Sequence, residues 1–380
     1  MPAASILIKP ASANCNMDCK YCFYKCLSSH REEYSKGFMK EETLETLVRE
    51  AIAYADGSLT FAFQGGEPTL AGLDFFQKAV ELQQKYNNKK LQIENTIQTN
   101  GLLIDEKWAR FLGEHRFLVG LSLDGPKKMH DRYRNDAAGQ DTFARIMHSV
   151  QLLEQYHVDY NVVTVVTNDT AKQASFLYKF WKRNHYPFVQ FIPCMDEIKR
   201  QDGTQERSIY AVEPEQYGKF LCELFDLWYA DFVAGEAMDI RMFSNLAQMA
   251  AGYPAEECGM NGCCNCYFVV EGDGSVYPCD FYCMDAWKLG NVNDGFVQMK
   301  TSEKAKAFVE ASRPVCATCQ ECPYFSLCRG GCRRWREPFV DGKPGLNQLC
   351  SAYRMFFAHA AESMERLGVY IRQKYAGSGK

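Results

Sequence analysis

Hydrophobic and polar positions alternate along the first half of the chain in two rhythms. Short runs rich in aliphatic and aromatic residues predict β-strands at residues 5–9, 59–63, 91–98, 117–124, 160–166 and 188–192. Between these runs, apolar residues recur every three or four positions, which predicts helices at about residues 41–54, 73–86, 106–112, 143–156 and 173–184. Six strands separated by helices indicate successive right-handed βαβ units with a parallel sheet.

Such a sheet is either doubly wound or curled into a barrel. Polar or glycine-containing segments follow several strands, among them Gln64-Gly65-Gly66-Glu67 and the segments at 98–101, 122–125 and 194. Active sites of parallel barrels lie at the C-terminal ends of the strands, so we expect these segments to surround one site. The charge-rich stretch at 195–212 would edge that site, and a helix at about 214–234 would complete the barrel.

Beyond about residue 237 the pattern changes, because most of the eighteen cysteines lie there. A hairpin is expected at residues 267–279, where Gly272, Asp273 and Gly274 supply the turn. A final helix is expected at about residues 352–374. We therefore divide the chain into a barrel domain, residues 1–236, and a cysteine-rich domain, residues 237–380.

Composition narrows the possible functions. A chain of 380 residues with 47% hydrophobic residues can bury a large core. A net charge of −4 gives no basic footprint for nucleic acid, and no apolar run is long enough to span a membrane. The N-terminus lacks the basic leader and apolar stretch of a signal peptide, so a cytoplasmic location is expected. In that reducing compartment, cysteines more often bind metals than form disulfides.

The main candidate site is the loop after the first strand, where Cys15, Cys19 and Cys22 have CxxxCxxC spacing. Three such thiolates can hold three irons of a cubic 4Fe-4S cluster and leave the fourth iron without a protein ligand. Two other interpretations remain open on spacing alone. Cys26 could complete a zinc site, which needs four ligands, or the cysteines could be buried free thiols.

The spacing, with Tyr21 before the last thiol, resembles the cluster loop of the radical S-adenosylmethionine enzymes. The resemblance implies that S-adenosylmethionine binds the open iron through its amino and carboxylate groups and is cleaved to a 5′-deoxyadenosyl radical. It also favours an α/β fold with a partial (β/α)6 TIM-like barrel over the doubly wound sheet.

The same resemblance assigns contacts with S-adenosylmethionine to residues of several segments. Two adjacent glycines allow the backbone to approach a ligand closely, and an arginine fork suits a carboxylate. The expected contacts are Gly65, Gly66 and Glu67 of GGEP for the amino group, Ser122 and Arg134 for the carboxylate and ribose region, and Tyr21 and Met195 for the adenine.

The cysteine-rich domain has a second pattern, CxxCx5CxxxC at residues 319–332, with further cysteines on both sides. It resembles the SPASM extension, which implies two auxiliary 4Fe-4S clusters. By resemblance, one cluster is held by Cys258, Cys264, Cys279 and Cys332, and the other by Cys319, Cys322, Cys328 and Cys350. A neighbouring thiol could replace Cys264, and a pair of structural zinc sites is the alternative. The cysteines without an assigned role are Cys26, Cys194, Cys222, Cys263, Cys266, Cys283 and Cys316.

Four arginines, Arg329, Arg333, Arg334 and Arg336, lie close in sequence to the cysteines at 328 and 332. A solvated basic surface is one interpretation. Alternatively, cations and hydrogen-bond donors near a negatively charged cluster raise its reduction potential, which would help the cluster to accept electrons.

Longer stretches narrow the resemblance to the anaerobic sulfatase-maturating enzymes. These stretches are IKPAS, CFY, FAFQGGEPTLAGL, QTNG, FLVGLSLDGP, CGMNG, GSVYPCDFY and CRGGCRR. The resemblance implies a radical S-adenosylmethionine oxidoreductase that converts a cysteine or serine in a Cys/Ser-x-Pro-x-Arg sequence of a sulfatase to Cα-formylglycine under anaerobic conditions.

In the implied reaction, the radical takes a hydrogen atom from the substrate Cβ. Asp280, which follows a cluster cysteine, accepts the thiol or hydroxyl proton, and an electron leaves to an auxiliary cluster. Tyr24 and Gln64 are candidates for holding the substrate peptide. A flavodoxin- or ferredoxin-like protein is the expected electron donor.

Two other functions remain. A SPASM maturase would form a thioether or carbon-carbon crosslink in a ribosomally made peptide. Many such enzymes carry an N-terminal leader-binding domain, whereas the strand pattern here begins by residue 5. A non-catalytic iron-sulfur or zinc protein would not need an open iron beside Gly65 and Gly66. Iron content separates these classes, because three 4Fe-4S clusters require about 12 irons per chain and a zinc protein little iron.

Overall fold

The parallel strands of the barrel lie side by side in the order of the chain. The structure is a computed structural model that describes residues 3–196, 208–339 and 342–377. The strands are β1 (Ala4–Ile8), β2 (Ser58–Phe63), β3 (Gln92–Thr99), β4 (Leu118–Ser122), β5 (Tyr160–Val166), β6 (Phe188–Pro193) and the short β7 (Asp239–Ile240). Every neighbouring pair from β1 to β7 is parallel. A doubly wound sheet would reverse its strand order, so the predicted partial (β/α)6 barrel is confirmed.

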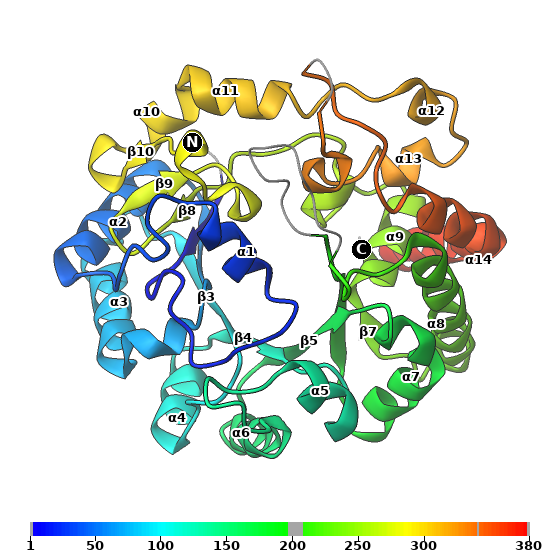
Figure 1. Cartoon of the computed structure of the whole chain (residues 1–380), viewed down its shortest axis with the longest axis horizontal. Helices are drawn as coiled ribbons and strands as arrows, with labels where there is room; N and C mark the ends of the chain where they lie inside the picture. The colour runs from blue at the N-terminus through cyan, green and yellow to red at the C-terminus, as the bar shows by residue number, and fades with distance from the viewer. Residues whose placement is uncertain (1–2, 197–207, 340–341, 378–380) are drawn as a thin grey trace.

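Helices cover the outer side of this curved sheet (Figure 1). The helices of the barrel are α1 (Phe23–Ser29), α2 (Glu41–Tyr54), α3 (Leu73–Tyr86), α4 (Glu106–Glu114), α5 (Lys127–Tyr133), α6 (Phe143–Gln155), α7 (Ala174–Arg183) and α8 (Pro214–Ala234), with the 3-10 turns η1 (Pro68–Ala71) and η2 (Thr170–Gln173). On α2, Leu44, Leu47, Val48 and Ala51 fall on one face and are buried. The apolar period that predicts α2 therefore also determines which face enters the core.

The cysteine-rich segment combines short strands with many short helices. Its elements are α9 (Arg241–Ala250), β8 (Val269–Val270), β9 (Ser275–Tyr277), β10 (Gly290–Asn291), α10 (Phe296–Thr301), α11 (Glu303–Glu310), α12 (Ala317–Gln320), α13 (Phe325–Cys328), α14 (Cys350–Gly377) and the 3-10 turns η3 (Cys258–Met260), η4 (Asp280–Tyr282), η5 (Asp285–Trp287), η6 (Val292–Asp294) and η7 (Arg333–Arg336). The predicted hairpin is confirmed, since β8 and β9 are antiparallel with Val270 opposite Val276. Gly274 has a φ of +80° in its turn, which suits glycine.

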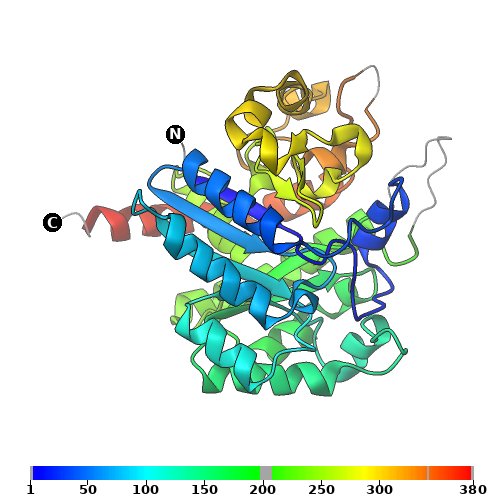
Figure 2. The same ribbon diagram turned by 90° about the vertical axis from the view of Figure 1, so that its left-hand side faces the viewer.

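The strands of the cysteine-rich segment continue the barrel sheet. Strand β8 pairs in parallel with β1, with Leu7 opposite Val269, and the whole sheet runs in the order β10-β9-β8-β1-β2-β3-β4-β5-β6-β7. Figure 1 shows α10 to α13 spanning the opening between the β8 side of the ring and α9, and Figure 2 shows this segment lying over the barrel. The boundary between residues 236 and 237 stays a prediction.

The last helix, α14, packs against α8 and α9 on the outside of the ring. The helices approach closely at Gly218 of α8, where a Cβ atom would lie 3.1 Å from the Cα of Ala352. A second close approach occurs at Gly368, where a Cβ atom would lie 2.6 Å from the carbonyl oxygen of Ala250. Small residues therefore allow the C-terminal helix to pack closely against the outside of the barrel.

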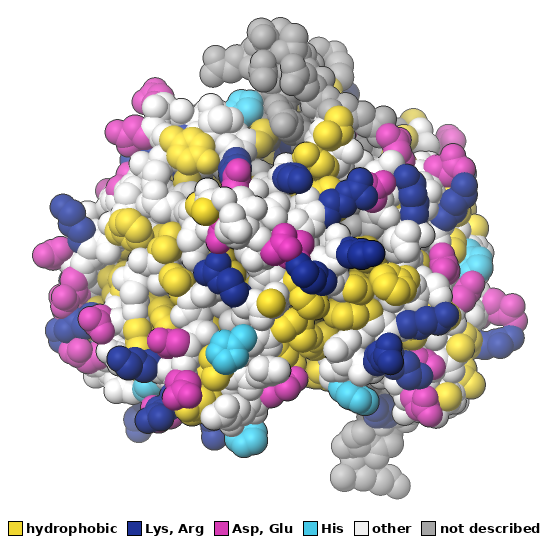
Figure 3. Space-filling model, turned by 60° about the horizontal axis from the view of Figure 1, so that its bottom comes forward, with side chains coloured by type: hydrophobic (Ala, Val, Ile, Leu, Met, Phe, Trp, Pro, Cys, Tyr) yellow, Lys and Arg dark blue, Asp and Glu magenta, His cyan; other side chains and the backbone are white. Residues whose placement is uncertain are grey.

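The surface carries both signs of charge. Figure 3 shows Lys and Arg side chains standing among Asp and Glu side chains around a central hydrophobic area. Charges mixed in this way largely cancel at a distance, in keeping with a formal net charge of only −4. In the described part of the chain, no helix is both long enough and apolar enough to cross a membrane.

Candidate active site

The three N-terminal cysteines lie in the loop between β1 and α1. Cys15, Cys19 and Cys22 are close enough for their charges to act on one another, and burial raises the pKa of Cys15 to about 11 and of Cys19 to about 12. The backbone N–H of Met17 points at Cys15 Sγ at 3.4 Å. Burial thus opposes bare thiolates, and bound iron ions would supply the missing positive charge. This donor set fits the predicted cluster.

The GGEP turn packs directly on the residues that precede the first cysteine. The backbone N–H of Gly66 donates to the carbonyl oxygen of Ser12 at 2.8 Å, and the backbone N–H of Glu67 donates to the carbonyl oxygen of Asn14 at 2.8 Å. A Cβ atom on Gly66 would lie 2.1 Å from the carbonyl oxygen of Asn14. Glycine is therefore required here for contact between two backbone segments, beyond any contact with a ligand.

The carboxylate of Glu67 points into the protein and fixes the QTNG loop. It accepts hydrogen bonds from the Thr69 hydroxyl at 2.6 Å, the Thr99 hydroxyl at 2.7 Å and the Asn100 backbone N–H at 2.7 Å. The Asn100 side chain in turn lies 3.9 Å from Cys15 Sγ. Glu67 thus connects the second strand, the third strand and the cluster loop. Its predicted contact with an amino group stays a prediction.

Two of the residues expected around S-adenosylmethionine share one buried carboxylate. Arg134 Nε lies 3.0 Å from Asp124 Oδ2, and the Tyr21 hydroxyl donates to the same oxygen. Ser122, at the end of β4, accepts a hydrogen bond from Gln98 at 3.2 Å. Sequence reasoning assigned no role to Asp124, although it ends the expected fourth strand, where site residues are anticipated.

A buried histidine forms hydrogen bonds beside the Asp124–Arg134 pair. The Asp124 backbone N–H lies 3.3 Å from His130 Nδ1, and His130 Nε2 lies 3.0 Å from Thr142 Oγ1. Burial lowers the pKa of His130 to about 4, so its imidazole is neutral near pH 7. The Thr142 hydroxyl also donates to the Arg134 carbonyl at 2.7 Å. His130 therefore helps to position both members of the Asp124–Arg134 pair.

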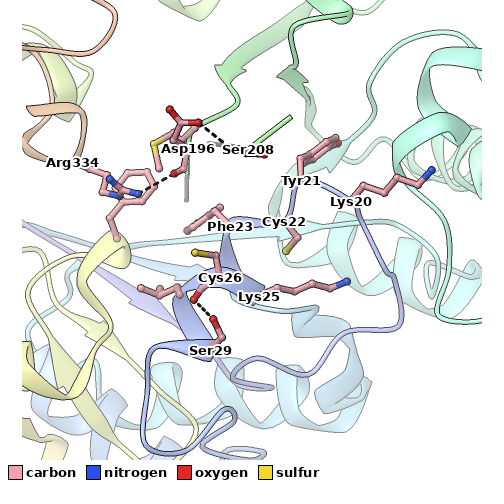
Figure 4. Close-up of a pocket in the computed structure, with 13 residues that line it drawn as sticks. Lys20, Tyr21, Cys22, Phe23, Lys25, Cys26, Ser29, Asp196, Ser208 and Arg334 are labelled. Carbon is pink, nitrogen blue, oxygen red and sulfur yellow. Dashed lines mark hydrogen bonds between the residues drawn. The ribbon is translucent and has the colours of Figure 1, made fainter. Parts of the chain in front are cut away.

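A cavity of about 330 Å³ opens beside the cluster loop (Figure 4). Its lining residues come from the loop, α1, the end of β6 and the cysteine-rich segment, and are Lys20, Tyr21, Cys22, Phe23, Lys25, Cys26, Leu27, Ser29, Met195, Asp196, Ser208, Phe281 and Arg334. Both residues expected at the adenine, Tyr21 and Met195, are among them. The volume falls in the range of small-molecule sites. Residues 197–207 of the expected charge-rich loop lie outside the described residues.

Asp280, Tyr24 and Gln64, which the sequence analysis singled out, lie together. The Tyr24 hydroxyl donates to Asp280 Oδ2 at 2.6 Å, and Gln64 Nε2 donates to the Tyr24 oxygen at 2.6 Å. Burial and the nearby Asp280 carboxylate raise the pKa of Tyr24 well above its ordinary value, so Tyr24 remains a donor. The Asp280 backbone N–H donates to Tyr267, whose hydroxyl lies 3.5 Å from Cys279 Sγ. The Tyr267 hydroxyl thus links Asp280 to Cys279, a predicted cluster ligand.

A buried lysine that the sequence analysis did not assign faces the same aspartate. Lys9 Nζ lies 2.7 Å from Asp280 Oδ1, and Lys9 is only 1% exposed. Glu271 lies between Lys9, at 3.7 Å, and Arg31, at 2.7 Å. Two buried cations therefore balance two buried anions. A lysine at the end of the apolar run Ile6 to Ile8 was the available signal, because a buried lysine needs a partner.

The first predicted auxiliary set converges from four places in the chain. Its members are Cys258, Cys264, Cys279 and Cys332, whose thiols influence one another electrostatically. A Cβ atom on Gly259 would lie 3.7 Å from Cys332 Cβ, which places the η3 turn beside that cysteine. Burial raises the pKa of Cys332 to about 11. Cys263 lies near Cys258 and Cys264, so the choice among neighbouring thiols stays open.

The second predicted set surrounds a small cavity. That cavity is lined by Thr318, Cys319, Cys322, Tyr324, Phe325, Cys328, Gly330, Cys350, Tyr353, Arg354 and Phe357, which include all four predicted ligands. Cys316 Sγ lies 3.7 Å from Cys319 Sγ but Cys316 does not line the cavity. None of the eighteen cysteines, all of which are described, forms a disulfide. The donor set fits a second auxiliary cluster.

A structural zinc ion and a 4Fe-4S cluster place different demands on their cysteine ligands. Within residues 3–196, 208–339 and 342–377, no three His, Cys, Asp or Glu side chains lie close enough to hold one ion. A structural zinc needs four ligands around one ion with Zn–S distances of about 2.3 Å. A 4Fe-4S cluster takes one cysteine per iron and so accepts thiols that lie farther apart.

Three of the four arginines near these cysteines are not part of a solvated surface. Arg333 and Arg334 are 5% exposed and Arg336 is 2% exposed. The basic-surface interpretation is therefore wrong for these three residues. Arg334 donates to the Asp196 carbonyl at 3.1 Å and lies 3.4 Å from Glu337, which links the cysteine-rich segment to the end of β6 (Figure 4).

Comparison with known proteins gives consistent results. Residues 10–179 match the Radical SAM superfamily, and residues 262–323 match the SPASM iron-sulfur cluster-binding domain. The chain is 47% identical to the cysteine-type anaerobic sulfatase-maturating enzyme of Clostridium perfringens, over 95% of this chain and 97% of the relative. It is 34% identical to the serine-type enzyme of Bacteroides thetaiotaomicron, over 95% and 90% of the two chains.

A solved structure has the same architecture. Native anSMEcpe with bound AdoMet and Cp18Cys peptide superposes with a TM-score of 0.91 at 45% identity, covering 97% of this chain and 100% of that chain. The two chains therefore share one fold along nearly their whole length. The relatives favour sulfatase maturation over both peptide crosslinking and a non-catalytic role.

Proposed function

Because the chain belongs to the anaerobic sulfatase-maturating enzymes of the radical S-adenosylmethionine superfamily, we propose that it oxidises a cysteine or serine of a sulfatase to Cα-formylglycine. The observation that supports this proposal best is the group formed by Asp280, Tyr24 and Gln64. It places a carboxylate with two polar partners near the N-terminal cysteine loop, where a substrate hydroxyl or thiol would need a base.

The reaction removes two hydrogens from the substrate residue. S-adenosylmethionine and the N-terminal cluster supply the radical chemistry that takes one hydrogen atom from Cβ. Asp280 takes the proton of the thiol or hydroxyl on a carboxylate oxygen, which makes the carbon radical a stronger reductant. Cys279 and the other cysteines of the first set would hold the group that accepts the remaining electron, which would leave a thiocarbonyl or a carbonyl on the substrate. Water would convert the thiocarbonyl to the aldehyde and release the sulfur as hydrogen sulfide.

The remaining residues prepare Asp280 for this step. Lys9, at 2.7 Å, holds one carboxylate oxygen, while Tyr24 holds the other. Burial would by itself lower the pKa of Lys9, but the Asp280 and Glu271 carboxylates outweigh burial, so its pKa is raised and it stays charged. Gln64 and the Tyr24 hydroxyl would then contact the substrate peptide. The residues that would bind S-adenosylmethionine are Tyr21, Gly65, Gly66, Glu67, Ser122, Arg134 and Met195.

The substrate is proposed to be a sulfatase segment with the sequence Cys/Ser-x-Pro-x-Arg. Identity to the cysteine-type relative, at 47%, exceeds identity to the serine-type relative, at 34%, which supports cysteine as the preferred residue. A flavodoxin- or ferredoxin-like protein is the proposed electron donor. The seven contacts with S-adenosylmethionine and the eleven cluster cysteines are part of the proposal.

The test incubates the anaerobic holoenzyme with S-adenosylmethionine, a chemical reductant and a peptide of about 18 residues. One peptide carries Cys-x-Pro-x-Arg and its twin carries Ser-x-Pro-x-Arg. Mass spectrometry should show loss of two hydrogens from the serine peptide and formylglycine from both, together with 5′-deoxyadenosine. Release of 5′-deoxyadenosine beside an intact peptide would contradict the proposal, and a thioether-linked product would support the crosslinking maturase.

A further inference from the structure

Arg333, which follows cluster cysteine Cys332, lies inside a cage of aromatic rings. Its guanidinium carbon is 4.9 Å from the Tyr282 ring, 4.9 Å from Trp287, 4.5 Å from Phe308 and 4.8 Å from Phe339. One Nη atom donates to the Phe308 carbonyl at 2.7 Å. Four aromatic rings, the Phe308 carbonyl and the Tyr282 hydroxyl, which itself donates to Glu337, surround the cation without forming a direct ion pair with it.

Arg336 lies against the turn that joins the two auxiliary sets. One Nη atom donates to the Ser312 carbonyl at 2.6 Å, and the other donates to the Pro314 carbonyl at 3.1 Å. A Cβ atom on Gly330 would lie 3.5 Å from the guanidinium, and Gly330 separates a ligand of one set from a ligand of the other. The Ser312 hydroxyl accepts the backbone N–H of Cys264 at 2.7 Å. Arg336 therefore touches structure that belongs to both sets.

Neither guanidinium has an acidic partner among the described residues. No carboxylate there lies within 4 Å of Arg333 or Arg336, whereas the neighbouring Arg334 has Glu337 at 3.4 Å. The Nε atoms of Arg333 and Arg336 are buried and also lack a hydrogen-bond partner in the described chain. An unpaired buried charge is costly, so it requires a counter-charge that the side chains do not provide.

The two arginines differ in which predicted set they adjoin. Arg333 follows Cys332 of the first set directly in the chain. Arg336 contacts Ser312, which holds the backbone N–H of Cys264, and also lies beside Gly330, two residues after Cys328 of the second set. Arg336 thus adjoins both sets.

We propose that the cluster thiolates are the missing counter-charge, that Arg333 raises the reduction potential of the first auxiliary cluster, and that Arg336 raises the potentials of both. A nearby cation stabilises the additional negative charge of a reduced cluster. Because Arg333 acts on the first site, beside Asp280, it favours that site as the first acceptor of the substrate electron. This last consequence rests on the proposed function, whereas the effects on the two potentials do not.

The test is a redox titration of the reconstituted holoenzyme in the absence of peptide. Electron paramagnetic resonance monitors the reduced clusters at each potential. The signal that changes on addition of S-adenosylmethionine belongs to the N-terminal cluster, which leaves two auxiliary signals. Arg336→Gln should lower the midpoint potentials of both. Arg333→Gln should lower only one. We expect the ratio of reduced to oxidised cluster at a fixed potential to fall at least about tenfold, which corresponds to about 59 mV for a one-electron couple.

Three control variants separate charge from structure. Arg333→Lys and Arg336→Lys keep the charge and should remain near the wild-type potentials. Arg313→Gln removes an exposed arginine of the same segment, paired with Glu310 at 3.0 Å, and should change neither potential. Unchanged potentials in the two Gln variants at full iron content would overturn the proposal. A shift of only one signal in Arg336→Gln would overturn the shared role.

Loss of iron is also decisive. If a Gln variant fails to bind its cluster while the matching Lys variant binds it, the positive charge is what the site requires, as proposed. If both variants lose the cluster, the arginine is needed for its shape alone and the proposal is wrong. Formylglycine formation enters none of these readouts, so the proposed function and this inference can fail separately.

Discussion

The two carboxylate oxygens of Asp280 have different partners. Lys9 forms an ion pair with one oxygen, and the Tyr24 hydroxyl donates a hydrogen bond to the other. This arrangement fixes the orientation of the acid before the substrate arrives, which is the main requirement for a general base. Sequence alone could identify Asp280, Tyr24 and Gln64 because they stand in or next to recognisable motifs. It could not identify Glu271 and Arg31, because buried ion pairs form between residues some 240 positions apart.

Replacement of Asp280 by asparagine tests the base directly. The asparagine amide would keep the volume and most hydrogen bonds but could not accept the substrate proton, so Asp280→Asn should lower formylglycine formation at least about 100-fold. The release of 5′-deoxyadenosine and the iron content of the variant should both remain at the wild-type level. The matched control is Asp285→Asn, a more exposed aspartate five positions later, which should retain full activity. If Asp280→Asn formed formylglycine as fast as a fully active Asp285→Asn control, Asp280 would be excluded as the base.

His130 makes the stability of the protein sensitive to acid. Its pKa is about 4 in the folded protein, below the ordinary value of 6.5, because burial disfavours the charged imidazole. The unfolded chain therefore binds the proton more readily, and stability present above pH 6.5 should be lost as the pH falls toward 4. The loss should be on the order of 3 kcal/mol.

Chemical unfolding at pH 7 and pH 5 measures this effect. In His130→Gln the uncharged amide can still accept from Asp124 and donate to Thr142, so its stability should fall less between the two pH values. An identical fall in the variant and the wild type would place the acid sensitivity elsewhere in the molecule.

At the scale of elements, helices α2, α3 and α8 have the bounds that the apolar period predicts. Helix α5, from Lys127 to Tyr133, was not predicted, because seven residues rich in basic side chains show no apolar stripe. Helix α9 was also not predicted, since it stands beyond the change in pattern at residue 237. Its buried face, which includes Met242, Phe243 and Leu246, nevertheless has the apolar period of a helix, and it packs against α14.

The contact between α8 and α14 determines where Cys350 lies, because that cysteine begins α14. Gly218→Leu would push the helices apart, since even a Cβ atom at this position would lie 3.1 Å from Ala352 Cα. We expect a loss of about 1–3 kcal/mol of stability and of about four irons per chain. Thermal unfolding and iron analysis measure the two effects.

Lys219→Leu is the control for that substitution. It places the same side chain on the next residue of α8, where the lysine side chain is 60% exposed. Only an exposed ion pair with Glu215 is lost, and solvent screening makes its contribution to stability small. If Gly218→Leu retains the full iron content, the position of α14 does not control the second auxiliary site.

At the scale of the whole molecule, three cysteine sets divide the metal content of the chain. The intact holoenzyme should contain about 12 irons per chain, and the triple variant Cys15→Ala, Cys19→Ala, Cys22→Ala should contain about 8. The variant should keep two auxiliary signals in electron paramagnetic resonance and should no longer cleave S-adenosylmethionine. Zinc in place of iron, or loss of all iron in the triple variant, would contradict three separate clusters.

The pairing of β8 with β1 has a consequence for any attempt to isolate the barrel. A fragment that ends at residue 236 would lack β8, and the backbone N–H groups of Leu7 and Lys9 that now donate to Phe268 and Val270 would face solvent. An uncovered strand of apolar residues recruits strands from other copies. The barrel domain alone should therefore aggregate, because the cysteine-rich domain that covers β1 in the intact chain would be missing.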